Sequence, residues 1–191
     1  SITGMATESN SIKVGKRMVV LGIDPGQTGG LALVSRDPKG KLSIIDARMM
    51  PLTHPTKKVT FDLKEAKRWI ESEAGRHQYE GGMSGFEIDF AVIENVHAMP
   101  RQGVSSSFQF GRMFGGVEQF AVWGTSAAYE PMYVSPAAWK MHYGLGSAKH
   151  ASIELATMMF ETDEYWKLKK HDGVAEAALI AAYGIFKETG I

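Results

Sequence analysis

Four acidic residues in this 191-residue chain have the types and spacing that metal chemistry needs. Asp24 and Glu94 each follow a short apolar run, and charges are rare at the ends of buried strands unless they are paired or bound. Asp172 and Glu176 lie four residues apart, which places them on one face of a helix. Four carboxylates brought together repel one another, so such a cluster usually persists because a cation offsets it. All-oxygen ligands favour Mg²⁺ or Mn²⁺, and two such ions about 4 Å apart are a standard device for the attack of water on a phosphodiester.

Each of these acids also has a simpler explanation. Asp172 near a helix start can satisfy free N–H groups, and Glu176 can be an ordinary solvated helix residue. Glu94 can pair with Arg101 or Arg112. Spacing alone therefore leaves two hypotheses open, namely a metal site in which the four acids converge and four unrelated acids.

The first acid lies in a glycine-rich segment, residues 21–30, with the sequence LGIDPGQTGG. Pro25 disfavours the α region for Asp24 and so keeps it extended to the end of its strand. The glycines allow a tight turn and the close approach of a ligand or of another backbone segment. The segment fits a metal site, a phosphate-binding loop or a plain turn between two strands.

The composition excludes several classes of site. The chain has no cysteine, which excludes disulfides, thiolate zinc sites and cysteine nucleophiles. No apolar run approaches membrane-spanning length, and a formal net charge of zero argues against a simple polybasic nucleic-acid binder. However, residues 95–117 and 131–153 carry basic residues and no acidic ones, which indicates either a local surface for polyanions or chance clustering.

The elements that must position these residues follow from hydrophobic periodicity, which predicts a single α/β domain over residues 18–191 after a flexible tail over residues 1–17. Strands are expected at residues 18–24, 31–34, 41–50, 88–94 and 129–134. Helices are expected at residues 62–73, 105–123 and 171–186. Two more are expected between them: a short helix that starts at Ser135-Pro136 and is interrupted at residues 144–146, and a helix that Ser147 caps and that ends at Phe160. This order predicts a mixed central sheet, with three antiparallel strands followed by parallel strands, and with helices on both faces.

The motifs, taken in order, match a family pattern. From residue 19 to residue 184 the chain resembles the RuvC-type Holliday junction resolvases of the ribonuclease H-like superfamily. Three segments of the chain are similar to the acidic motifs of this family: LGIDPG at 21–26, AVIE at 91–94 and KKHDGVAEA at 169–177. Two further segments, VSPAAWK at 134–140 and GLGSAK at 144–149, are similar to its basic DNA-binding segment. The last two acids are usually three apart in bacterial members, so the spacing of four looks more like the phage and plant-chloroplast branch.

The resemblance implies a ribonuclease H-like fold and an endodeoxyribonuclease that resolves four-way DNA junctions as a homodimer, by nicking opposite strands symmetrically. It implies that Asp24, Glu94, Asp172 and Glu176 are catalytic and bind two Mg²⁺ ions, for which Mn²⁺ is expected to substitute. One ion would lower the pKa of the attacking water and the other would stabilise the leaving 3′ oxygen, giving 5′-phosphate and 3′-hydroxyl ends. Branched DNA is then the partner, and no nucleotide cofactor and no membrane are expected. The expected location is the cytoplasm, for a protein encoded by a bacterium or by a phage. The sequence leaves open an organelle, which the protein would reach with a transit peptide that is later removed.

The resemblance also implies which residues contact DNA. Lys140 and Lys149 in the basic segment are expected to neutralise phosphates. The loop after Glu94 would enter the centre of the junction, where an aromatic side chain such as Phe108 can wedge between bases. The alternative is that Phe108 and Phe110 begin the core of a helix. The remaining expected DNA contacts are Arg101, Gln102 and Arg112.

Three small residues lie along the helix expected at residues 105–123, namely Gly111, Gly115 and Gly116. Small side chains let two helices approach closely. The partner in such a contact can be a second subunit of a two-fold dimer or another element of the same chain, and the sequence leaves both open.

Two other functions stay open. Residues 22–29 also resemble the phosphate loop of an actin-like or sugar-kinase ATPase half, although such proteins need a second lobe and a second glycine-rich motif, which this sequence lacks. The other alternative is a non-catalytic junction-binding protein whose acids serve another purpose. The presence of all four acids argues against it.

Overall fold

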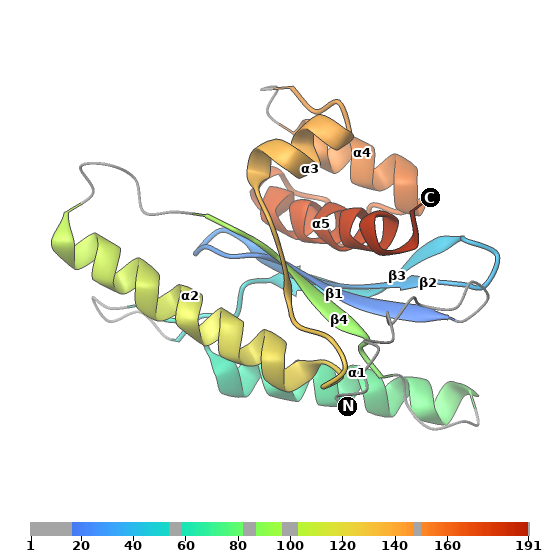
Figure 1. The fold of residues 1–191 in the computed structure, drawn as a ribbon, viewed down its shortest axis with the longest axis horizontal. Coiled ribbons are helices and arrows are strands. Elements are labelled where there is room, and N and C mark those ends of the chain that lie inside the picture. Colours follow the sequence, from blue (N-terminus) through green and yellow to red (C-terminus); the bar gives the residue numbers. More distant parts are fainter. Residues whose placement is uncertain (1–16, 54–58, 82–86, 97–102, 147–149, 191) are drawn as a thin grey trace, which may run out of the picture.

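A computed structural model of the chain describes residues 17–53, 59–81, 87–96, 103–146 and 150–190. These residues form a central sheet with a layer of helices on each face, as Figure 1 shows. The predicted tail over residues 1–17 lies outside the described residues except for Arg17. No helix in the described ranges is long and apolar enough to cross a membrane.

The sheet has five strands in the order β3-β2-β1-β4-β5. The first three strands are antiparallel neighbours, whereas β4 lies parallel to β1 and β5 lies parallel to β4. The prediction of a mixed α/β sheet with helices on both faces is therefore confirmed. The strands are β1 (Met18–Asp24), β2 (Gly30–Arg36), β3 (Leu42–Met49), β4 (Phe90–Glu94) and β5 (Met132–Val134).

The two faces of the sheet carry separate apolar clusters because side chains alternate along each strand. On β1, Val19, Leu21 and Ile23 face one layer, whereas Val20 faces the other. The first layer consists of α1 (Leu63–Gly81) and α2 (Val104–Gly124), which lie below the sheet in Figure 1. The second layer consists of α3 (Pro136–His142), α4 (Ala151–Phe160) and α5 (Asp172–Thr189), and a 3₁₀ turn (Lys169–His171) precedes α5.

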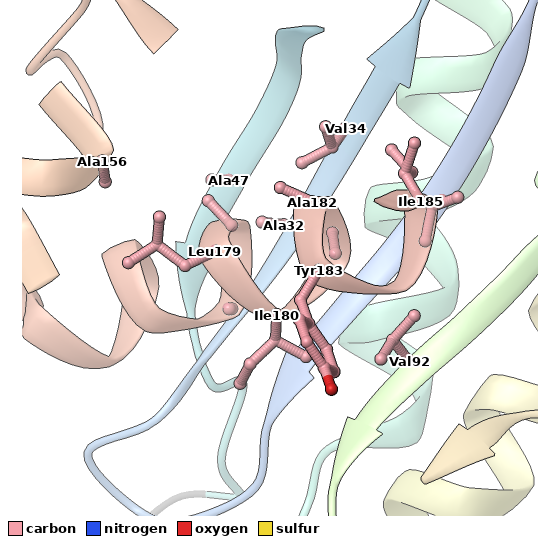
Figure 2. Packing of buried hydrophobic residues seen from close by; sticks show 14 of the residues in the cluster. Ala32, Val34, Ala47, Val92, Ala156, Leu179, Ile180, Ala182, Tyr183 and Ile185 are labelled. Carbon is pink, nitrogen blue, oxygen red and sulfur yellow. The ribbon is translucent and has the colours of Figure 1, made fainter. Parts of the chain in front are cut away.

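Helix α5 lies directly on the backbone of the sheet. Its residues from Gly173 to Ile185 are buried except for Glu176, and they contact both β1 and β2. Figure 2 shows Leu179, Ile180 and Ala182 of α5 packed among side chains of the sheet. A helix that is buried along nearly its whole length cannot be read from amphipathic periodicity, and its alanine-rich sequence reflects the short distance to the strands.

The glycine-rich turn after Asp24 serves this close packing. Gly29 forms an isolated backbone bridge with Gly173 at the start of α5, and a Cβ atom on Gly173 would lie 2.3 Å from the carbonyl oxygen of Thr28. Under the sheet-facing side of α5, a Cβ on Gly22 would lie 2.0 Å from the carbonyl oxygen of Ala177. The close approach that these glycines permit is therefore made to α5.

Some element boundaries differ from the predicted ones. Helix α1 continues to Gly81 rather than ending at residue 73, because the apolar spacing that predicted it stops at Ile70 while the backbone remains helical. Helix α5 continues to Thr189 rather than ending at residue 186. It ends at Gly190, whose φ of 71° is the left-handed conformation that commonly stops a helix.

Candidate active site

The two acids at strand ends lie at the same edge of the sheet. Strands β1 and β4 are parallel neighbours in which Ile23 pairs with Ile93, so the next residues, Asp24 and Glu94, follow at adjacent carboxyl ends. The two acids of α5 reach the same edge because the start of this helix is joined to the β1–β2 turn. The sheet and α5 thus bring acids from three separate segments of the sequence to one edge of the sheet.

The pKa of Asp24 is influenced by the other three acids. Burial raises the pKa of Asp24 well above its ordinary value, and the charges of Glu94, Glu176 and Asp172 raise it further. The charge of Lys140 acts in the opposite direction and lowers this pKa. Asp24 therefore lies in a site where an added negative charge is disfavoured and an added positive charge is favoured.

Glu94 is buried and is held by an indole group. Its side chain is 5 % exposed, and its Oε1 accepts a hydrogen bond of 2.8 Å from Nε1 of Trp139 on α3. Burial raises the pKa of Glu94, the hydrogen bond from Trp139 lowers it, and the charge of Glu176 raises it. Among the described residues, no ion pair joins Glu94 to Arg112, and Arg101 lies outside the described ranges.

Glu176 is half-buried and has two partners from the layer of α3 and α4. Nζ of Lys140 lies 3.1 Å from Oε1 of Glu176, and Oγ of Ser152 donates a hydrogen bond of 2.9 Å to the same oxygen. The predicted phosphate contact Lys140 therefore lies inside the carboxylate site. Lys149, the other predicted basic contact, lies outside the described residues.

Asp172 is exposed at the first residue of α5. Its Oδ1 accepts a hydrogen bond of 3.0 Å from the backbone N–H of Gly173, so it satisfies a free N–H group at the helix start, as the simpler explanation expected. The same position leaves its carboxylate close enough to raise the pKa of Asp24. Both interpretations of Asp172 are therefore compatible with its place in the fold.

The donor set fits a hard divalent cation in its chemistry. It consists of carboxylate oxygens only, and their mutual repulsion is what a cation would relieve. Within the described part of the chain, no three acidic or histidine side chains lie in positions that could hold a metal ion between them as they are placed. Glu176 is paired with Lys140 in this arrangement, so a bound cation would compete with an ammonium group for that carboxylate.

A cleft of about 470 Å³ lies beside the site, between the turn after Asp24 and the first half of α2. Phe108, one of its lining residues, is 67 % exposed, so the alternative that this side chain begins the helix core is wrong. Arg112 also lines the cleft, and Gln102 lies outside the described residues. The described residues that line it are Gly26, Gln27, Val59, Ser105, Ser106, Phe108, Gln109, Phe110, Arg112 and Met113.

Sequence reasoning did not find Trp139 and Ser152 as partners of the carboxylates. Trp139 lay within the motif VSPAAWK, where it was counted with the basic segment rather than as a donor. One signal was available, because a buried tryptophan usually finds an acceptor for its N–H group. The helix that carries it was predictable, since Ser135 caps α3 by accepting a hydrogen bond of 3.2 Å from the N–H of Ala138.

Comparison with known proteins supports the fold. No protein-family model matches the sequence, and no curated protein matches it. Among solved structures, the chain is similar to Thermus thermophilus RuvC in complex with a Holliday junction substrate, with a TM-score of 0.54, 17% sequence identity, and coverage of 90% of this chain and 98% of that one. A second structure of Thermus thermophilus RuvC matches with a TM-score of 0.51 and 20% sequence identity, and the match covers 91% of this chain and 97% of that one. The chain therefore has the ribonuclease H-like fold of RuvC.

Proposed function

We propose that this protein is a metal-dependent endonuclease that resolves four-way DNA junctions. The proposal is supported by two observations: Asp24 and Glu94 follow adjacent parallel strands, and the charges of Glu94, Glu176 and Asp172 all raise the pKa of Asp24. The fold adds support, since one of the similar structures is described as a complex with a Holliday junction substrate.

The four acids would hold the cation, preferably Mg²⁺, with Mn²⁺ as a substitute. When bound, two such ions lower the pKa of an attacking water and stabilise the leaving 3′ oxygen. The protein's own residues prepare the site. The Trp139 indole holds Glu94, and Lys140 places a positive charge beside Glu176, where it can neutralise a phosphate oxygen.

We infer that a DNA strand approaches the site along the cleft. Gly26, two residues after Asp24, is one of its lining residues, and none of the described lining residues is acidic. Arg112 supplies a positive charge, and Ser105 and Ser106 supply hydroxyl donors of the kind that contact phosphates. The exposed Phe108 fits the role of an aromatic wedge against unpaired bases.

A second copy of the chain would match the two-fold symmetry of a junction. On α2, Val104, Phe108, Gly111, Gly115 and Val122 recur at spacings that keep them on one face. The three large side chains of this stripe are exposed, and a Cβ on either glycine would meet nothing within 4 Å. Gly116 differs, because its Cβ would lie 3.3 Å from the Phe61 ring, so it packs within the chain.

The decisive test is cleavage of synthetic four-way junctions with Mg²⁺, compared with duplex and flap substrates of the same sequence. We expect paired nicks at symmetric positions on the junction and at least about a hundredfold slower cleavage of the duplex. A protein that binds junctions and does not cleave them with either Mg²⁺ or Mn²⁺ would instead be a junction-binding protein without nuclease activity.

Lys140→Met tests the cation inside the site, because methionine keeps an apolar side chain of similar length. Cleavage is expected to fall by about a hundredfold, since one positive charge near the scissile phosphate is lost. The logarithmic salt dependence of junction binding should also become shallower by about one. Lys187→Met, at the opposite end of α5 and exposed, is the matched control and should leave both values unchanged. Equal cleavage rates for the two variants would show that Lys140 has no role in cleavage.

Gly115→Glu tests the proposed dimer. The monomer tolerates a side chain here because the space is open, whereas a close helix–helix contact would not. Light scattering after size-exclusion chromatography should show a dimer for the wild type and a monomer for the variant. Met158→Glu adds the same charge at an exposed position on α4, away from the stripe, and should stay dimeric. A monomeric wild type that still makes paired nicks would contradict the dimer.

A further inference from the structure

Trp139 makes a contact with the carboxylate site that packing alone does not explain. Its side chain is fully buried, with 0% of its surface exposed, and its only polar atom donates a 2.8 Å hydrogen bond to Oε1 of Glu94. Glu94 is itself 5% exposed, so water does not compete strongly for this bond. The contact joins α3 to the end of β4, two segments that lie 45 residues apart in sequence.

The chemistry of the indole group makes this hydrogen bond one-directional. Nε1 is a donor that neither accepts a hydrogen bond nor ionises in the ordinary pH range, so Glu94 must act as the acceptor. A carboxylate has two oxygens, and the indole engages only Oε1. The orientation of Glu94 is thereby fixed while Oε2 stays available for another partner.

Helix α3 also positions the ammonium group of Lys140. Lys140 follows Trp139 directly, its Nζ lies 5.0 Å from the centroid of the Trp139 ring, and the same atom lies 3.1 Å from Oε1 of Glu176. A cation over an indole face is held by the ring's quadrupole. One side chain therefore contacts Glu94 with its edge and Lys140 with its face.

We propose that Trp139 is a positioning residue, which holds Glu94 so that its second oxygen faces the divalent cation. The proposal rests on the nuclease function proposed above and assigns to Trp139 the part of an outer-shell donor. Groups that hydrogen-bond to metal-ligating carboxylates fix their orientation, and their loss typically lowers metal affinity or activity by about 10–100-fold.

The chain offers a matched control in Trp166. This tryptophan is 1% exposed, belongs to the same apolar cluster, and donates its Nε1 hydrogen bond over 3.0 Å to Oγ1 of Thr157. Phenylalanine at either position removes one indole N–H group and a similar volume from one cluster. The two variants differ in the acceptor that is left behind, which is a buried carboxylate in one case and a hydroxyl in the other.

The first experiment compares Trp139→Phe with Trp166→Phe. Trp139→Phe should raise the Mg²⁺ concentration for half-maximal junction cleavage by about 10–100-fold, whereas Trp166→Phe should leave it within about twofold of the wild type. The dissociation constant for the junction without divalent cation should be unchanged in both variants. A similar Mg²⁺ requirement in the two variants would reduce Trp139 to a packing residue and overturn the proposal.

The second experiment reads the contact without DNA and without cleavage. The four indole N–H groups of the ¹⁵N-labelled wild type give separate NMR signals, which single substitutions assign. Adding Mg²⁺ should shift the Trp139 signal and leave the Trp166 signal in place, and Glu94→Gln should remove that response. An unmoved Trp139 signal at saturating Mg²⁺ would overturn the proposal, and this measurement stands even where Trp139→Phe fails to fold.

These two experiments separate the proposal from the function on which it rests. A wild type that shows the Trp139 response to Mg²⁺ but cleaves no junction would contradict the proposed substrate and support the role of Trp139. A wild type that cleaves junctions while Trp139→Phe behaves like Trp166→Phe would support the function and overturn the role.

Discussion

Asp24→Asn is expected to abolish junction cleavage and, in the absence of divalent cations, to raise the melting temperature of the protein. The loss of cleavage should be about a thousandfold or more, because an amide replaces a charged oxygen ligand at the centre of the carboxylate site. Junction binding should be retained, since removing a negative charge does not weaken contacts to phosphates.

The gain in stability follows from the sign of the pKa shift. Burial and the neighbouring acids raise the pKa of Asp24, so the folded state favours its protonated form. The stabilising effect of a raised pKa is fully present below the pKa of the unfolded chain, about 3.9, and is lost as the pH rises through the raised value. Above that value the ionised Asp24 destabilises the fold, and asparagine removes this unfavourable charge, so the melting temperature rises.

Thermal unfolding in EDTA between pH 4 and pH 8 checks the sign. The difference in melting temperature between Asp24→Asn and the wild type should be small at pH 4 and should grow as the pH rises. Adding Mg²⁺ should then stabilise the wild type and leave the variant unchanged, because a ligand stabilises only the state that binds it. An Asp24→Asn variant that is less stable than the wild type at pH 8 would show that the carboxylate of Asp24 has a favourable partner. Full cleavage activity of this variant would show that Asp24 is not a catalytic residue.

Gly22→Ala is expected to destabilise the protein by about 3 kcal/mol or more. The added Cβ would lie 2.0 Å from the carbonyl oxygen of Ala177 and 2.8 Å from Cβ of Ala181, both in α5. Neither atom belongs to a flexible side chain, so either the helix must move away from β1 or the strand must bend. The corresponding fall in melting temperature is roughly 6–12 °C for a domain of this size.

Urea unfolding followed by circular dichroism measures this effect, with Gly146→Ala as the control. Gly146 has open space around its would-be Cβ, so alanine there should leave the free energy of unfolding unchanged or raise it by less than about 1 kcal/mol. If Gly22→Ala were as stable as Gly146→Ala, helix α5 would not rest on the backbone of β1 as described.

The acids at strand ends were predictable because local sequence carries their signal. Apolar runs that stop at Asp24 and Glu94 indicate buried strands with a charged end, and both strands are found there. The pairing of β4 with β1 depends on the topology of the sheet, and the spacing of residues in the sequence does not predict it. The meeting of the two acids therefore became an observation only in the folded chain.

The parts of the site that were missed depend on contacts between distant segments. The partner of Glu94 is an indole from α3 and a partner of Glu176 is the hydroxyl of Ser152 on α4, and no periodicity links either pair. The glycines near Asp24 predicted the close approach of a ligand or of another backbone segment, and a sequence cannot tell which of the two is present. The stretch of α1 after Glu73 was missed because it lacks the apolar spacing on which the prediction relied.

The contact between β1 and α5 also sets the order in which this molecule can become active. The first strand of the described chain and its last helix pack on each other, so the contact closes a loop that includes almost the whole domain. During synthesis, β1 leaves the ribosome long before α5 does, so one face of the sheet lacks this helix until α5 has been made. Since Asp172 and Glu176 arrive with that helix, a chain still being made holds only half of its carboxylates. Any cutting of DNA would then begin only once folding is complete.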